Sequence, residues 1–110
     1  MKTTITTWQR VSLLSLIGTI EGNFRMIHYA DMWQTALEFT KADSDSIGLV
    51  QDEQSLHWTS AHDWDVELPD DPQALAVIQA KFKEAVWPAR SAKDVKSLAE
   101  LLKVSLDSPA

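Results

Sequence analysis

The sequence predicts a small, mostly helical α+β domain, and three observations support this fold class. Segments toward both ends of the chain place apolar residues at the three- and four-residue spacing of helices. The middle of the chain instead alternates apolar and polar residues, as short strands do. A length of 110 residues with 45% hydrophobic and 24% charged residues suits a single globular domain. The predicted order is helix, helix, short helix, strand, strand, helix, helix, with the strands in one antiparallel hairpin.

The first two helices have the strongest patterns. From Trp8 to Ile20 apolar residues cover most of the helix surface, which predicts a helix packed between others, and Gly18 and Gly22 mark its end. We expect Asn23 to cap the second helix. Its apolar stripe comprises Met26, Tyr29, Ala30, Trp33, Ala36 and Leu37.

The central region predicts one short helix and the hairpin. Either Asp43 or Ser44 is expected to cap the short helix, and Gly48 to end it. Alternating apolar and polar residues then predict two strands, at 56–58 and 64–68, paired as an antiparallel hairpin. The solvent face of this hairpin is expected to carry His57, Asp65 and Glu67.

Two amphipathic helices close the chain. Asp70 or Asp71 is expected to cap the first of them, with Pro72 in its first turn and Pro88 ending it after Trp87.

The last helix is expected to begin at a capping box formed by Ser91 and Asp94. Its predicted buried residues are Val95, Leu98, Leu102 and Leu106. Residues 1–4 and 107–110 are expected to be frayed ends of a single domain spanning 1–110.

The negative charge of the chain is concentrated in its middle. No lysine or arginine occurs between Lys41 and Lys81, and the formal net charge of the chain is −6. The nine carboxylates of this segment are Asp43, Asp45, Asp52, Glu53, Asp63, Asp65, Glu67, Asp70 and Asp71. Such a field repels a nucleic-acid backbone and favours a basic partner or a cation. Asp70 and Asp71 have a sufficient explanation as helix-start residues.

The order of these elements resembles that of a family of small uncharacterised bacteriophage and prophage proteins. The matching features are the leucine-rich stretch 13–16, the turn at 21–24, the 47–49 end of the short helix, Trp58 and the strand at 66–68. The likeness spans about Val11 to Leu102, and its order and spacing carry it. The resemblance implies a phage or prophage context in the host cytoplasm and supplies no catalytic residues.

Few residues suggest chemistry. The chain has no cysteine, and it lacks the nucleophile and phosphate-loop motifs of common enzyme classes. Imidazole and carboxylate groups at His57, His62 and Asp65 are weak metal candidates without a recognised ligand spacing. We therefore expect no enzymatic activity and no cofactor. No apolar run approaches the roughly 20 residues of a membrane span, so we expect a cytoplasmic protein that does not bind membranes.

Three helices followed by a hairpin is also the order of a winged helix, whose third helix enters the major groove of DNA. Here both the third helix and the hairpin are acidic, which argues against DNA binding because phosphate contacts require lysine and arginine. Most of the five tryptophans suit core packing, with Trp87 the best candidate for exposure.

The sequence thus favours a non-enzymatic phage accessory protein that binds a basic protein of host or phage through an acidic face. The predicted partner-binding residues are Asp43, Asp45, Asp52, Glu53, Asp63, Asp65, Glu67 and Trp87. Two alternatives stay open: a self-associating module that dimerises through the second and fourth helices, and a degenerate winged helix that retains DNA affinity.

Overall fold

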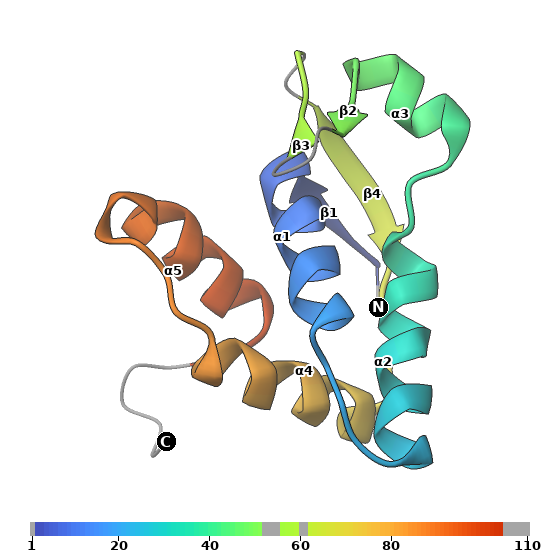
Figure 1. Cartoon of the computed structure of the whole chain (residues 1–110), viewed down its shortest axis with the longest axis vertical. Coiled ribbons are helices and arrows are strands. Elements are labelled where there is room, and N and C mark those ends of the chain that lie inside the picture. Colours follow the sequence, from blue (N-terminus) through green and yellow to red (C-terminus); the bar gives the residue numbers. More distant parts are fainter. Residues whose placement is uncertain (1, 52–55, 60–61, 105–110) are drawn as a thin grey trace.

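The computed structural model describes residues 2–51, 56–59 and 62–104. Figure 1 shows the arrangement of its helices and strands. In chain order the elements are β1 (Lys2–Thr6), α1 (Thr7–Gly18), α2 (Phe24–Leu37), α3 (Lys41–Ile47), β2 (Val50–Gln51), β3 (Leu56–His57), β4 (Asp63–Glu67), α4 (Pro72–Glu84), the 3₁₀ turn η1 (Ala89–Ser91) and α5 (Ala92–Leu101).

The predicted fold class is confirmed: the protein is a small, mostly helical α+β domain that contains an antiparallel hairpin. In Figure 1, α1 lies between α2 and α5, and α4 runs across the ends of α1 and α2. In the β1–β4 sheet, β1 lies partly behind α1 and β4 lies beside it, while α3 and the β2–β3 hairpin sit at one end of the molecule. Within the described ranges, no helix is long and apolar enough to cross a membrane.

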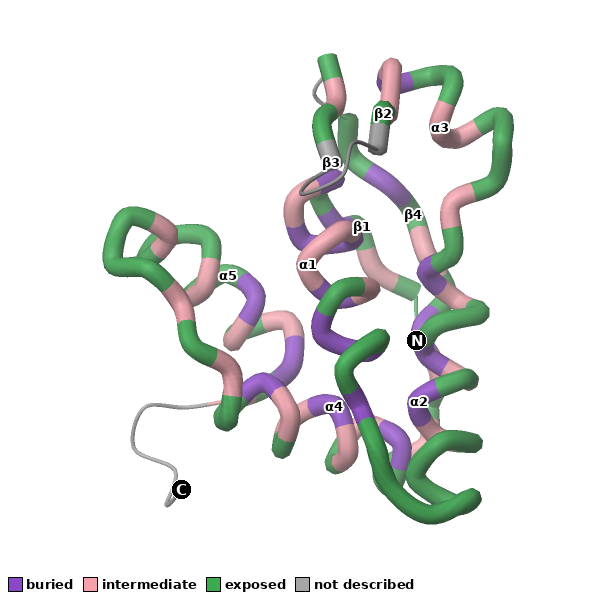
Figure 2. The backbone as a smooth tube through the Cα atoms, in the orientation of Figure 1, coloured by how far each residue is buried: buried purple, intermediate pink, exposed green. Residues whose placement is uncertain are grey.

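The core draws residues from all five α-helices and from both strands of the β1–β4 sheet. Figure 2 shows the buried positions on the inward sides of these elements. The buried apolar residues are Ile5, Leu13, Leu16, Ile17, Ile20, Ala30, Trp33, Leu37, Ile47, Trp64, Leu68, Ala74, Ile78, Phe82, Leu98 and Leu102. The predicted buried residue Leu106 lies outside the described residues.

The strand pairing differs from the prediction. β4 pairs with the N-terminal strand β1, and β3 pairs instead with β2 in a short hairpin. The expectation that residues 2–4 are frayed is therefore wrong. Four of the five residues of β1 are β-branched, which favours extended backbone, and burial of Ile5 against the core holds the strand in place.

Most of the helix caps follow local sequence signals. The side chains of Asn23 and Asp71 accept hydrogen bonds from the first-turn amides of α2 and α4, as expected. The cap of α3 is Thr40 and neither Asp43 nor Ser44, because Asp43 occupies the third helical position of a capping box and its carboxylate accepts from the Thr40 N–H. Gly48 ends α3 in the left-handed region, at φ 64°.

Two predicted details at the C-terminal end are wrong. The Ser91 side chain makes no capping hydrogen bond to α5. The 3₁₀ turn η1 comes directly before α5, and the backbone of η1 continues into that helix. α4 ends at Glu84 and not after Trp87. Ala85 already has extended backbone angles, so the chain leaves the helix three residues before Pro88. The departure from the helix brings Trp87 against Trp8 and Phe82.

Candidate protein-binding face

Three predicted partner-binding carboxylates stand together on β4. The side chains of Asp63, Asp65 and Glu67 alternate along the strand with the buried Trp64 and the half-buried Val66, so all three point away from the core. The register places Lys2, Thr4 and Thr6 of β1 directly opposite them. We call these six residues the sheet face: Lys2, Thr4, Thr6, Asp63, Asp65 and Glu67, all of which are exposed.

The sheet face carries three carboxylates and one ammonium group, so its formal charge is negative. The Thr4 hydroxyl donates to the Asp65 carboxylate at 2.7 Å, which orients that carboxylate. A hollow of ≈ 450 Å³ is lined by residues from both strands, and these are Lys2, Thr3, Thr4, Asp65, Val66 and Glu67. Carboxylates held by a sheet that packs on the core have little freedom to reorganise when a cationic partner arrives.

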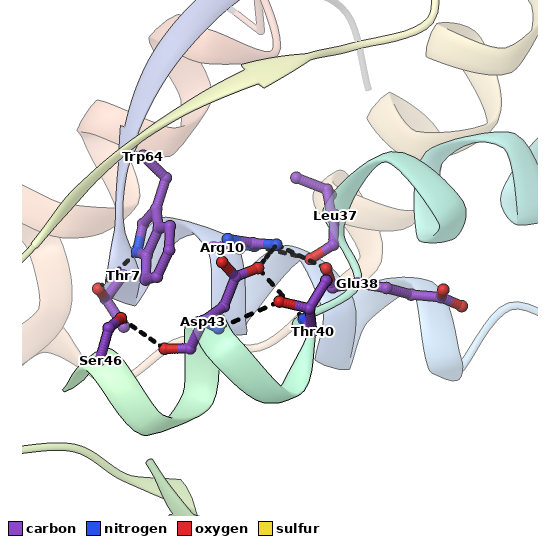
Figure 3. Close-up of polar contacts among 8 residues, drawn as sticks. All are labelled: Thr7, Arg10, Leu37, Glu38, Thr40, Asp43, Ser46 and Trp64. Carbon is purple, nitrogen blue, oxygen red and sulfur yellow. Dashed lines mark hydrogen bonds and ion pairs between the residues drawn. The ribbon is translucent and has the colours of Figure 1, made fainter. Parts of the chain in front are cut away.

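Asp43 does not belong to an exposed acidic face, which corrects its predicted role. Its carboxylate faces inward and pairs with the Arg10 guanidinium at 3.2 Å (Figure 3). It also accepts from the Thr40 N–H in the capping box. Burial by itself would raise the pKa of the Asp43 carboxyl, but the Thr40 hydrogen bonds and the Arg10 charge outweigh it and lower the pKa below its ordinary value.

Arg10 is the residue that the sequence analysis missed. It is 5% exposed and donates to the backbone carbonyls of Leu37 at 2.7 Å and Glu38 at 2.6 Å, where α2 ends. Its guanidinium carbon lies 4.1 Å from the centre of the Phe39 ring and 4.7 Å from that of Trp64. Arg10 thus joins α1, α2, α3 and β4, a structural and not a partner-binding role.

A local signal for Arg10 does exist. It lies three, four and seven residues before Leu13, Leu14 and Ile17, which places its charge on the apolar side of α1. A charge at such a position needs a partner and buried carbonyl acceptors. The sequence does not reveal that these are Asp43 and the end of α2.

The remaining predicted carboxylates are dispersed or outside the described residues. Asp45 is exposed on α3, apart from the sheet. Asp52 and Glu53 lie outside the described residues. Among the residues that the structure describes, the candidate face is therefore the β4 strand, where three carboxylates are gathered.

Trp87, predicted to be the best candidate for an exposed tryptophan, is partly buried. Its ring centre lies 6.2 Å from that of Trp8 and 5.7 Å from that of Phe82. It lines a groove of ≈ 510 Å³ between α1 and the end of α4. Its indole N–H is buried and finds no hydrogen-bond partner among the described residues, so the ring contributes mainly packing at this position.

The three weak metal candidates do not form a site. Among the described residues, no three histidine, aspartate or glutamate side chains are close enough to share a metal ion. The His62 ring packs edge-on against Trp64, with 4.2 Å between ring centres, and its backbone carbonyl accepts from Thr7. His57 and Asp65 lie on different sheets.

Comparison of the chain with models of known protein families, with curated proteins and with solved structures gave no match. A functional inference therefore starts from the geometry of the sheet face.

Proposed function

We propose that this protein binds a basic protein partner through the sheet face and has no catalytic chemistry of its own. The observation that carries the proposal is the row of exposed carboxylates on β4, at Asp63, Asp65 and Glu67. Alternate residues of a strand lie about 6.6 Å apart, a spacing that cationic side chains of a facing segment can match. Charge complementarity of this kind speeds association and selects basic partners over acidic ones.

The charge distribution weighs against the DNA-binding alternative. α3 would be the recognition helix of a winged-helix protein, and its seven residues include Lys41 but also Asp43 and Asp45. The sheet face of the β1–β4 sheet is acidic as well. Phosphate contacts supply most of the non-specific affinity for DNA and need clustered basic groups, which this side of the described structure lacks.

Self-association is a second candidate, because α2 exposes apolar side chains at its start. Phe24 is 89% exposed and Ile27 is 44% exposed. The stripes of α2 and α4 that were expected to form a dimer interface pack mainly on each other, and Phe24, Met26 and Ile27 are the large apolar residues that stay exposed on α2. Light scattering of the wild type and of Phe24→Ser tests this: a dimer that becomes a monomer on substitution supports it, and a monomeric wild type refutes it.

The biological setting of the proposal comes from the resemblance to phage and prophage proteins described above. On that basis we propose that the protein acts in the cytoplasm of a bacterial host and that its partner is a basic host or phage protein, such as one that itself binds nucleic acid.

A pair of charge-matched triple variants tests the main proposal. The first replaces Asp63, Asp65 and Glu67 by Asn, Asn and Gln. The second, the control, replaces exposed acidic residues of the C-terminal helices in the same way, at Glu84, Asp94 and Glu100. Each variant removes three negative charges, so the two differ only in where the charge is lost.

Affinity capture from a bacterial lysate, followed by mass spectrometry, is the measurement. We expect basic proteins to be retained by the wild type and the control but lost from the β4 variant, and to be released as the salt concentration rises. Equal capture by all three proteins, or equal loss from both variants, would contradict the proposal. Thermal melts of both variants check that they remain folded.

A further inference from the structure

The two strands of the β1–β4 sheet each have one hydrogen-bonded neighbour among the described residues, so each presents an outer edge. The Thr7 N–H donates to the His62 carbonyl at 3.3 Å, in the register that continues the ladder. Because hydrogen-bonded and non-hydrogen-bonded pairs alternate, Ile5–Trp64 and Thr3–Val66 are the hydrogen-bonded pairs. The intervening residues direct their backbone N–H and C=O groups outward.

The two outer edges are not equally open. On β1, the outward N–H of Thr6 is already taken by the Gln9 side chain at 2.9 Å, and the strand runs directly into α1. On β4, the outward backbone groups include those of Asp63 and Asp65. Within the described part of the chain no hydrogen bond satisfies the groups of these two residues. A row of unpaired N–H and C=O groups is a template for another strand.

We infer that the outer edge of β4 accepts an extended segment of the partner as a third strand, and that this segment carries lysine or arginine at alternate positions. The inference rests on the proposed function and specifies how the partner docks. Main-chain hydrogen bonds would supply affinity, and the side chains of alternate residues would supply specificity.

The same residues of β4 form both the open backbone edge and the sheet face. Asp63 and Asp65 direct their backbone groups outward and their side chains to the solvent face, so an added strand would pair directly opposite them. Its residues opposite these two positions would place their side chains beside the carboxylates, about 5.5 Å away between Cα atoms. Lysine or arginine at these positions is favourable.

The same geometry selects a basic partner over a second copy of this chain. Pairing of β4 with β4 of another copy would bring carboxylates beside carboxylates, which is destabilising. Charged side chains on an edge strand protect it from self-pairing in this way. A strand with alternating basic residues removes the repulsion and satisfies the backbone groups at once.

The test compares three peptides on the wild-type protein. The first is a seven-residue peptide of threonine and valine with lysine at positions 2, 4 and 6. The second has the same composition with its three lysines consecutive. The third repeats the first with N-methyl groups on the amides of the lysine residues, which keeps the charge but removes donors needed for strand pairing. Titration and amide hydrogen exchange by NMR are the two readouts.

We expect the alternating peptide to bind at least about tenfold more tightly than either control, because each control loses hydrogen bonds or ion pairs. At a peptide concentration 100 times its Kd, exchange of the outward amides of Asp63 and Asp65 should slow about 100-fold. Asp65→Pro removes one outward N–H without touching the β1 ladder, so it should weaken binding more than Asp65→Asn does.

The outcomes separate this inference from the proposed function. If all three peptides bind equally and the Asp63 and Asp65 amides exchange as before, strand addition is wrong while binding of basic partners stands. If none binds but the β4 triple variant still loses its lysate partners, strand addition is again wrong and the proposed function survives. If the peptides do not bind and the triple variants capture the same proteins as the wild type, both are wrong.

Discussion

Removing the Arg10 side chain should destabilise the protein more than any surface substitution. Arg10 is buried, donates to the Leu37 and Glu38 carbonyls and to Asp43, and lies against two aromatic rings. The substitution Arg10→Ala leaves these acceptors at the junction of α2 and α3 without the donor that satisfies them. It also leaves a gap beside the Phe39 and Trp64 rings.

The expected loss follows from these contacts. Each hydrogen bond from the charged guanidinium to a carbonyl contributes about 1.5–3 kcal/mol, and contact with the two rings contributes about 1–2 kcal/mol. These terms do not add in full, because burying the guanidinium costs solvation, and breaking such a network costs about 3–5 kcal/mol overall. At about 4 °C per kcal/mol for a domain of this size, Tm should fall by about 12–20 °C.

Urea unfolding at pH 7, followed by tryptophan fluorescence, measures this loss. The matched control is Arg25→Ala, because Arg25 is exposed on α2 and its removal should change stability by no more than about 0.5 kcal/mol. Arg10→Lys keeps the charge but not the planar fork, so its stability should fall between those of the wild type and the alanine variant. A loss below about 1 kcal/mol for Arg10→Ala, with an unchanged m-value, would refute the assigned role.

Three further predictions test other parts of the structure. Because the pKa of Asp43 is lowered in the folded state, the charged carboxylate stabilises the protein above the ordinary pKa of 3.8, and this stabilisation disappears as the pH falls through the folded pKa. In urea titrations, the difference in stability between the wild type and Asp43→Asn should therefore narrow below pH 3.8. A constant difference down to pH 2 would contradict this prediction. Gly48→Ala should lower the free energy of unfolding by about 1–2 kcal/mol or more, because Gly48 has a positive φ and an added Cβ would meet the Thr59 hydroxyl. In the same thermal melts Gly18→Ala should be neutral or stabilising, because an added Cβ there meets no atom within 4 Å. Similar melts for both variants would refute this reasoning. Ile5→Ala should cost about 2–5 kcal/mol in chemical denaturation, since Ile5 is 1% exposed; an unaffected variant would mean that the N-terminus is frayed after all.

The sequence predicted the parts of the fold that depend on neighbouring residues. Asn23 and Asp71 are recognisable as caps because a capping side chain bonds amides two or three residues away. The apolar stripe that places Trp33 and Leu37 in the core is likewise a property of one helix. These interactions lie within a single turn or face, so the printed sequence contains both partners.

The candidate site was predicted in part. The alternation over 64–68 correctly put the side chains of Asp65 and Glu67 on the solvent side of a strand, because a strand alternates its faces whatever its partner. The strand partner itself was wrong. Asp43 was assigned to the acidic face because nothing local shows that a buried arginine 33 residues earlier pairs with it.

The sequence alone determined the five helices, the strand character of β3 and β4, several helix ends and the acidic character of β4, since these follow from composition and from spacings of two to four residues; it did not predict β1 or β2. Only the tertiary structure decided that β1 is the partner of β4, 61 residues away at the Thr4–Asp65 pair, and that Arg10 connects α2 and α3. The β1–β4 pairing and the Arg10 contacts both depend on which segments pack against each other in the core. A residue pattern specifies the face that a segment must bury, but the segment that covers this face is chosen by packing of the whole chain.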